Sequence, residues 1–141
     1  MARRQRKVLS CGAVVVRETP QGWRFLLLRA FGHWDFPKGL AENGEEPMHA
    51  ALREIHEETT LDDLSFPWGD EFFETGPYSR GKVARYYLAR TEHGNVAILP
   101  NPDTGRPEHV EFRWCTLAEA RRLAAPRVKD VIGWAEGRLG G

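Results

Sequence analysis

Three glutamates that could bind a metal ion lie close together near the middle of the chain: Glu54, Glu57 and Glu58. In a helix, residues three and four positions apart share a face, so these carboxylates are expected to lie together. A solvated acidic surface is the ordinary alternative. However, hardly any basic residue is interleaved with the three, and Arg53 stands only at their edge. A divalent cation such as Mg²⁺ or Mn²⁺, which prefers carboxylate and water oxygens, would relieve the repulsion.

A helix that begins at Pro47 is predicted to position these carboxylates, because proline is favoured at the first helical position. Glu45 and Glu46 precede it, where carboxylates suit the positive end of the helix dipole. The opposite face is predicted to pack on the core through Met48, Ala51, Leu52, Ile55 and Thr59. A polar, acidic loop with glycines at positions 39 and 44 leads into the helix.

The spacing of these residues resembles the Nudix box, a motif of 23 residues that here covers residues 39–61. Gly39 is followed by five residues and Glu45, and then by seven residues and the sequence Arg-Glu-Ile-His-Glu-Glu at positions 53–58. Such a fixed spacing argues against a chance match. One position departs from the family, which has glycine where this chain has Thr60. A β-branched residue would be strained in the left-handed conformation that glycine adopts at a helix end.

The resemblance implies a role for each residue of the motif. Glu57 and Glu58 would be the main metal ligands, and Glu54 would be a ligand or the general base. Arg53 would be structural and would orient a carboxylate through a bidentate ion pair, with Glu45 as the candidate partner. A carboxylate-bound Mg²⁺ or Mn²⁺ suits hydrolysis of a phosphoanhydride, because it withdraws charge from phosphoryl oxygens and lowers the pKa of bound water.

A further metal ligand is expected from a later loop, because family members often add an acidic residue there. Glu108 is the first candidate, since it lies where a loop leads into a strand, and Glu111 is the second. A surface carboxylate is the alternative for both.

Basic and aromatic residues outside the motif are candidates for binding a nucleotide. Lys38, directly before the motif, could contact a phosphate. Lys82, with Arg80 beside it, could hold more distant phosphates. Tyr78 could stack on a base. Residues 86 and 87 are both tyrosines on one predicted strand, and strand alternation allows only one of them to line the site; Tyr87 is the candidate, and a core position is the alternative.

Three further segments resemble the asymmetrical bis(5'-nucleosyl)-tetraphosphatases within the Nudix superfamily. They are Cys-Gly-Ala-Val-Val at residues 11–15, Trp-Asp-Phe-Pro-Lys-Gly at 34–39 and Phe-Arg-Trp at 112–114. This resemblance implies hydrolysis of diadenosine tetraphosphate to ATP and AMP. RNA 5'-pyrophosphohydrolases and nucleoside triphosphate pyrophosphohydrolases are the nearest alternatives. A non-catalytic nucleotide-binding module is disfavoured, because all three carboxylates are present.

The 141 residues and zero formal net charge suit one domain, assigned to residues 10–137, behind a basic and flexible tail at residues 1–9. We expect a small-molecule nucleotide as the partner, no membrane, nucleic acid only in the RNA alternative, and a monomer or weak homodimer. Cys11 and Cys115 lie in apolar, strand-like surroundings without metal-type spacing, which indicates buried thiols and a cytoplasmic location.

The expected fold class is α/β: an α/β/α sandwich with a mixed sheet between the Nudix helix and the C-terminal helices. Two apolar runs joined by a short turn predict an antiparallel hairpin covered on both faces. Pro37 is expected to end a short edge strand, and Thr116 with Glu119 predicts a capping box. Strands are predicted at residues 8–18, 23–29, 34–36, 71–74, 82–90, 96–99 and 108–114, and C-terminal helices from residue 117 and over residues 127–137.

Overall fold

The computed structural model describes residues 8–100, 103–106 and 111–140. Seven strands form one sheet: β1 (Val8–Thr19), β2 (Gly22–Ala30), β3 (His33–Asp35), β4 (Lys38–Leu40), β5 (Phe72–Tyr78), β6 (Lys82–Arg90) and β7 (Glu111–Cys115). The helices are α1 (Pro47–Thr59), α2 (Leu117–Leu123) and α3 (Lys129–Leu139), with the short 3-10 helix η1 (Pro126–Val128) before α3.

Strand β1 is the centre of the sheet. It pairs in parallel with β6 and antiparallel with β2 and β4, so the sheet is mixed, as predicted. The main path runs β3-β2-β1-β6-β5, with β7 also paired to β2. The predicted hairpin of β1 and β2 is therefore confirmed, and the short strand that ends before Pro37 does lie at an edge.

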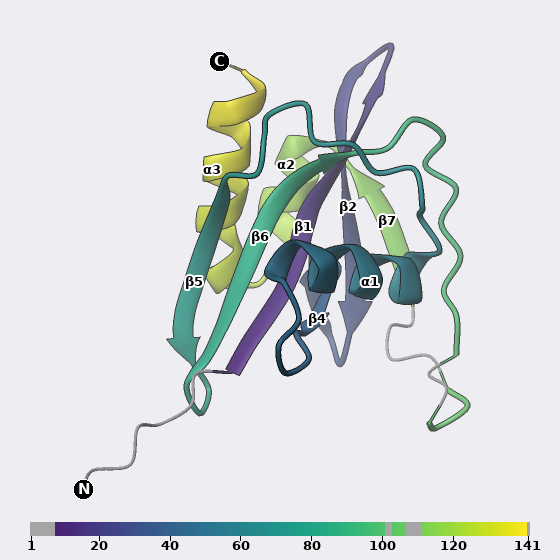
Figure 1. The fold of residues 1–141 in the computed structure, drawn as a ribbon. Helices are drawn as coiled ribbons and strands as arrows, with labels where there is room; N and C mark the ends of the chain where they lie inside the picture. Colours follow the sequence, from purple (N-terminus) through teal and green to yellow (C-terminus); the bar gives the residue numbers. More distant parts are fainter. Residues whose placement is uncertain (1–7, 101–102, 107–110, 141) are drawn as a thin grey trace, which may run out of the picture.

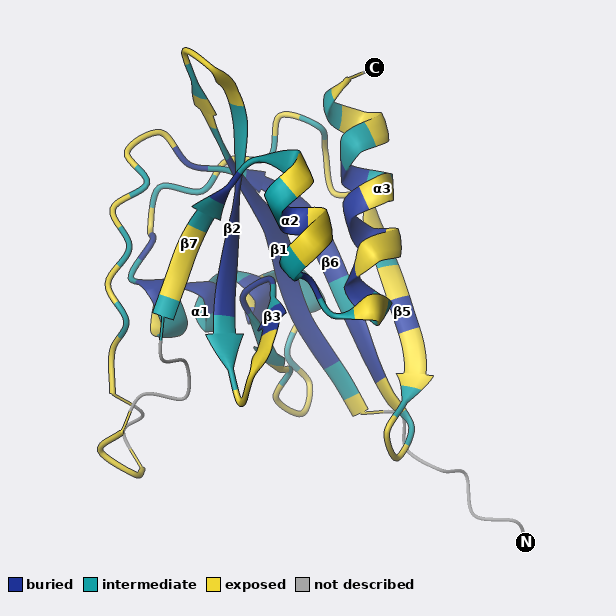
Figure 2. Cartoon of the chain, turned by 180° about the vertical axis from the view of Figure 1, so that it is seen from behind, coloured by how far each residue is buried: buried dark blue, intermediate teal, exposed yellow. Residues whose placement is uncertain are grey.

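The helices cover both faces of the sheet (Figures 1 and 2). Helix α1 packs on one face over a buried cluster that includes Val15, Leu26 and Ile55. Helices α2 and α3 pack on the other face over a second cluster, which includes Val14 and Leu27. The residues of β1 alternate between the two clusters because successive strand side chains point to opposite faces. This arrangement is the predicted α/β/α sandwich.

Strand β4 differs from the prediction, which placed a loop there. Lys38 pairs with Gly12, and Leu40 pairs with Ser10 of β1. The approach requires glycine in β1, because a Cβ atom at Gly12 would lie 2.1 Å from the Pro37 carbonyl oxygen and 2.4 Å from Cβ of Lys38. The pairing brings Lys38 and the first two residues of the motif against the central strand of the sheet.

Smaller differences concern the segments that flank the sheet. The strand predicted at residues 71–74 is longer in the structure, where β5 continues to Tyr78 and its register with β6 shifts between Thr75 and Tyr78. Residues 96–99 form no strand, although the Ala97 amide donates to the Thr59 carbonyl. Strand β1 begins at Val8, so the last two residues of the predicted tail belong to the sheet. The capping box of α2 is present.

Helix α1 begins at Pro47, as predicted, and ends in a left-handed residue. Thr60 has φ 67° and ψ 2°, and its amide donates to the His56 carbonyl. The helix therefore ends in a left-handed turn made by a β-branched residue, which is strained in that conformation.

Replacing Thr60 by Gly is expected to leave activity intact and to raise the melting temperature by a few degrees. Relief of the left-handed strain, about 1–2 kcal/mol, exceeds the backbone entropy cost of glycine, about 0.5–1 kcal/mol. Thermal unfolding measures the change. Thr59→Gly is the matched control and should destabilise, because Thr59 is helical, fully buried and bonded through its hydroxyl to Ile55. A lower melting temperature for Thr60→Gly would show that the turn depends on the threonine side chain.

Both cysteines are fully buried, as predicted. Burial raises the pKa of Cys11 and of Cys115 to about 11, so both remain neutral thiols at physiological pH. Within the described residues, no helix is long and apolar enough to cross a membrane.

Candidate active site

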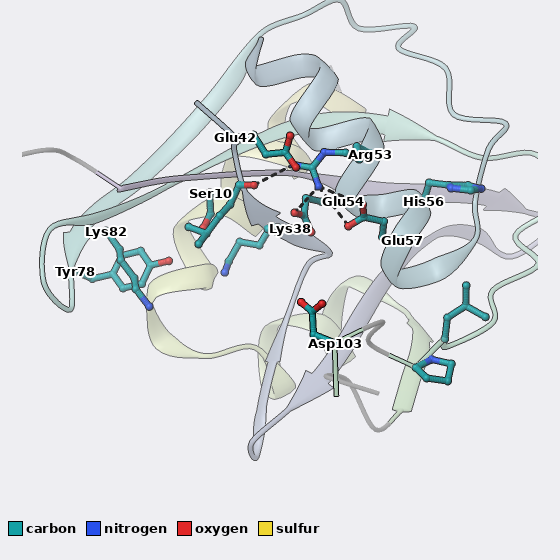
Figure 3. A pocket seen from close by; sticks show the side chains of 14 residues that line it. Ser10, Lys38, Glu42, Arg53, Glu54, His56, Glu57, Tyr78, Lys82 and Asp103 are labelled. Carbon is teal, nitrogen blue, oxygen red and sulfur yellow. Dashed lines mark hydrogen bonds and ion pairs between the residues drawn. The ribbon is translucent and has the colours of Figure 1, made fainter. Parts of the chain in front are cut away.

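The acidic face of α1 opens on a pocket of about 730 Å³ between the helix, β4 and the β5–β6 hairpin (Figure 3). From the motif and its preceding lysine, the pocket is lined by Lys38, Gly39, Arg53, Glu54 and Glu57. The hairpin adds two of the predicted substrate-binding residues, Tyr78 and Lys82. Carboxylates and basic groups thus share one cavity, although they come from segments far apart in the sequence.

Arg53 and Glu45 form the bidentate ion pair that the sequence predicts for Arg53. The guanidinium Nε and Nη2 atoms donate to the two carboxylate oxygens of Glu45, each at 2.8 Å. Nη2 also donates to the Leu40 carbonyl at 3.1 Å, which ties the helix to β4. The hydrogen bonds from Arg53 lower the pKa of Glu45 to about 2, and the Glu42 amide adds to the effect. The pair therefore stays ionised across the physiological range.

Glu45 is expected to stabilise the fold only above strongly acidic pH. Its folded pKa of about 2 lies below its ordinary value of 4.5. Stability from the pair is therefore complete above about pH 4.5 and is lost as the pH falls through about 2. Melting temperatures of the wild type and Glu45→Gln, measured from pH 7 to pH 2, should converge at the acid end. A constant difference across that range would contradict this role for the Glu45 carboxylate.

The Arg53 guanidinium also contacts two further carboxylates of the motif, those of Glu54 and Glu57. Arg53 Nη1 lies 2.9 Å from Glu54 Oε1 and 3.3 Å from both carboxylate oxygens of Glu57. Glu58 is held from the other side, because its Oε2 accepts the backbone N–H of Lys38 at 3.0 Å. Main-chain and side-chain contacts thus hold Glu54 and Glu58 against β4, whereas Glu57 remains more exposed.

Gly39 is required by the closeness of Glu54. A Cβ atom at position 39 would lie 2.0 Å from Glu54 Oε2 and 2.1 Å from its carboxyl carbon. Any side chain there would displace the carboxylate or the strand. The glycine that opens the motif therefore serves the position of Glu54 rather than a turn.

The donor set on α1 fits a hard divalent cation in its chemistry. All three side chains offer carboxylate oxygens, which Mg²⁺ and Mn²⁺ prefer. The side chain of Glu57 is 57% exposed, so it can rotate toward a bound ion, whereas Glu54 is only 16% exposed. Glu54, Glu57 and Glu58 could hold such an ion, although Glu58 is not among the residues that line the pocket.

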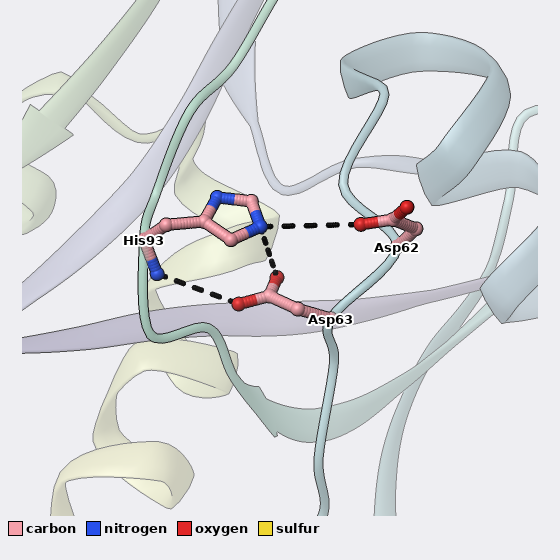
Figure 4. Close-up of side chains that lie close together, drawn as sticks. All are labelled: Asp62, Asp63 and His93. Atoms are coloured by element: carbon pink, nitrogen blue, oxygen red, sulfur yellow. Dashed lines mark hydrogen bonds and ion pairs between the residues drawn. The ribbon is translucent and has the colours of Figure 1, made fainter.

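A different group brings its potential ligand atoms within 4.8 Å of one another: Asp62, Asp63 and His93 (Figure 4). Hydrogen bonds account for this cluster. Asp63 accepts from the Thr91 hydroxyl at 2.6 Å and from two backbone amides, while His93 Nε2 lies 3.4 Å from Asp63. Nδ1 of His93 accepts the Asn95 amide, so Nε2 carries the proton. The cluster fastens the loop after β6 to the segment after α1.

The structure does not bring every predicted residue to the pocket. Tyr87 is only 4% exposed and packs edge-on against Phe72 on the α1 side of the sheet. Its neighbour Tyr86 is fully buried on the other side, which agrees with the core alternative. Glu111 pairs with Arg29 at 2.6 Å. Glu108 lies outside the described residues.

The pocket also contains residues that the sequence did not indicate. Ser10 of β1 and His56 of α1 line it. Asp103 enters from the loop before β7, and its carboxylate points toward the residues of the motif (Figure 3). Leu99 and Pro100 reach the pocket from the same loop. Residues 91–107 are rich in glycine, proline and asparagine, a composition typical of a loop. Long loops in compact domains are often functional, but this composition points to no particular side chain.

Comparison with known proteins identifies the family. A model of the NUDIX domain matches residues 6–135. The chain belongs to the NUDIX family. This Nudix hydrolase is 32% identical, over 125 residues, to an asymmetrical bis(5'-nucleosyl)-tetraphosphatase from Caenorhabditis elegans, covering 83% of this chain and 85% of the relative. An RNA pyrophosphohydrolase from Azorhizobium caulinodans is 31% identical over 116 residues, covering 70% of this chain and 67% of the relative.

This chain is also similar to a solved structure of an Ap4A hydrolase. The crystal structure of a C. elegans Ap4A hydrolase binary complex matches with a TM-score of 0.78 and 27% identity, over 94% of this chain and 98% of that chain. The match confirms the Nudix fold and the resemblance to the asymmetrical tetraphosphatases.

Proposed function

We propose that this Nudix hydrolase cleaves a phosphoanhydride bond in a dinucleoside polyphosphate, with diadenosine tetraphosphate and water giving ATP and AMP. The observation that carries the proposal is the division of the pocket. Glu54 and Glu57 lie toward one end of the pocket and Tyr78 and Lys82 toward the other, with Lys38 between them (Figure 3). A polyphosphate chain with a base at its end needs both parts. The relatives named as asymmetrical tetraphosphatases support this choice of substrate.

The residues divide the work of the reaction. Lys38 and Lys82 bind phosphate oxygens, and Tyr78 stacks on a base. Mg²⁺ or Mn²⁺ held by Glu54, Glu57 and Glu58 would supply charge neutralisation and a water of lowered pKa. The water oxygen forms a bond to phosphorus, and the bond from phosphorus to a bridging oxygen breaks with its electron pair on the leaving nucleotide. A carboxylate, with Glu54 as the candidate, accepts the proton from the water.

An RNA 5'-pyrophosphohydrolase is the second candidate, because several relatives carry that name. Incubation with Mg²⁺ and either diadenosine tetraphosphate or 5'-triphosphorylated RNA separates the two. We expect ATP and AMP from the dinucleotide, with ¹⁸O from labelled water in one product to locate the attack. Pyrophosphate release from RNA, with the dinucleotide intact, would overturn the proposal. Metal dependence is tested by adding EDTA, which we expect to abolish turnover, and then excess Mg²⁺, which we expect to restore it.

We also place the protein in the cytoplasm under this proposal. The two buried thiols, Cys11 and Cys115, form no disulfide with each other. Free thiols suit a reducing compartment, where nucleotides such as ATP are made and used.

A further inference from the structure

Arg127, which contacts the pocket residue Tyr78, lies in a network of hydrogen bonds. It belongs to η1, and its guanidinium reaches residues of three strands. Nη2 lies 2.6 Å from Asp35 Oδ2, and Nη1 lies 2.8 Å from the Tyr86 hydroxyl and 2.9 Å from the Thr75 hydroxyl. Its side chain is 25% exposed and does not line the pocket. Arg127 is nevertheless connected to two residues that do line the pocket. It is connected to Lys38 through Asp35, and it contacts Tyr78 directly.

The first connection runs through Asp35 to Lys38. One carboxylate oxygen, Asp35 Oδ2, lies 2.6 Å from Arg127 Nη2 but 3.8 Å from Lys38 Nζ. The shorter contact is a charge-assisted hydrogen bond, whereas the longer one exceeds hydrogen-bonding distance. The Asp35 carboxylate also accepts the Phe36 amide and the Tyr86 hydroxyl. Asp35 is therefore satisfied without Lys38, and the lysine ammonium can donate to a phosphate.

The second connection is the contact between Arg127 and Tyr78. The guanidinium carbon lies 4.3 Å from the centre of the Tyr78 ring, which is a cation–π distance. Tyr78 stands at the end of β5, just past the point where the register with β6 shifts. The arginine covers one face of the ring and fixes its plane. The ring also lines the pocket, where it can offer a surface to a base.

We propose that Arg127 is a positioning residue of the substrate pocket: it neutralises Asp35, which leaves Lys38 for phosphate, and it holds the Tyr78 ring in place for a base. This inference rests on the proposed function. Without Arg127, Lys38 would become the cation nearest to the partly buried carboxylate of Asp35 in this network. The ammonium would then be drawn from the phosphates, and the ring of Tyr78 would lose its support.

The charge of Arg127 persists at every working pH. Burial by itself would lower its pKa, but Tyr86 and Asp35 raise it further than burial lowers it. Burial, reinforced by Asp35, raises the pKa of Tyr86, so its hydroxyl stays neutral and can accept from the arginine while donating to Asp35.

The test uses three variants of the full chain: Arg127→Met, Arg127→Lys and the double variant Asp35→Asn with Arg127→Met. KM and kcat are measured with diadenosine tetraphosphate. Inhibition constants are measured for tripolyphosphate, which reports on the phosphate side, and for adenosine, which reports on the base side. Arg121→Met is the matched control, because Arg121 is exposed on α2, forms an ion pair with Glu136 of α3 and does not line the pocket. Its constants should equal those of the wild type.

Arg127→Met is expected to raise KM by about tenfold, with kcat changed less, and to weaken both inhibitors by about 3–30-fold. The double variant should restore tripolyphosphate binding, because the neutral amide introduced at position 35 no longer attracts Lys38, but it should not restore adenosine binding. Arg127→Lys should keep tripolyphosphate binding and weaken adenosine, because an ammonium lacks the planar group. A merely structural role would not change the binding of tripolyphosphate and of adenosine in these different ways.

Two results would overturn the inference. One is a folded Arg127→Met protein, by circular dichroism and melting, with unchanged KM and inhibition constants. The other is equal weakening of both inhibitors in all three variants, which would mean that Arg127 only supports the fold. If the wild type does not hydrolyse diadenosine tetraphosphate, the proposed function fails. The dissociation constants of tripolyphosphate and adenosine, measured by calorimetry on the same variants, then still decide the role of Arg127.

Discussion

Glu57→Gln is expected to lower kcat on diadenosine tetraphosphate by about 10²–10⁴-fold. Glu57 lines the pocket with its side chain 57% exposed. Replacing a carboxylate oxygen by an amide removes a charge from the set that would hold the metal ion, and such an ion supplies several kcal/mol of transition-state stabilisation. At about 1.4 kcal/mol for each factor of ten, this loss gives the stated range. Steady-state kinetics with saturating Mg²⁺ measure it.

Glu46→Gln is the matched control for this change. Glu46 is an exposed residue before α1, and its side chain makes no capping hydrogen bond to the helix. It does not line the pocket. The control should keep kcat within about twofold of the wild type, since the change lies on the surface. If Glu57→Gln kept full turnover as well, the assignment of the metal site to the acidic face of α1 would be wrong.

Gly39→Ala is the second change with a large expected effect. The added methyl group would lie about 2.0 Å from Glu54 Oε2, and the side chain of Glu54 is only 16% exposed. Strand β4 is fixed to β1, so the carboxylate must move. We expect kcat to fall by about 10²-fold, because a displacement of 1 Å at an active site costs that much. Overpacking should also lower the free energy of unfolding by about 1–3 kcal/mol.

Gly133→Ala tests whether this effect is specific to position 39. Gly133 lies inside α3, and a Cβ atom there meets nothing within 4 Å. Alanine should raise the free energy of unfolding by about 0.5–1 kcal/mol and leave kcat unchanged. Urea unfolding and steady-state kinetics on both variants provide the comparison. Wild-type kinetics for Gly39→Ala would mean that Glu54 can be displaced at no cost and has no part in the reaction.

Local patterns in the sequence were sufficient for the start of α1 and for its ion pair. Pro47 begins the helix, because its effect depends on backbone geometry within one turn. The sequence did not decide how the helix ends, because threonine is strained in the left-handed conformation that Thr60 adopts. The pair of Arg53 with Glu45 joins residues only eight positions apart, across a loop and the first turns of the helix. The mixed sheet between helices followed from apolar runs, whose burial on both faces requires two covering layers.

Strand β4 and the separation of the tyrosines depended on the tertiary structure. Residues 38–40 contain no apolar alternation, and they form a strand because β1 has a glycine where they approach. Alternation of side chains showed that residues 86 and 87 must face opposite ways. It did not show that helices cover both faces at that point, so that each tyrosine is under 5% exposed.

The sequence alone determined the family, the acidic face of α1 and the lysine beside it, because the spacing within a helix and its adjoining loop places those groups without help from distant residues. The tertiary structure alone decided which distant groups meet them. Tyr78, Lys82 and Asp103 reach the pocket from a hairpin and a late loop, and Arg127 reaches Asp35 across 92 positions of sequence. No local periodicity encodes such contacts, because they depend on how strands and helices pack around the whole sheet.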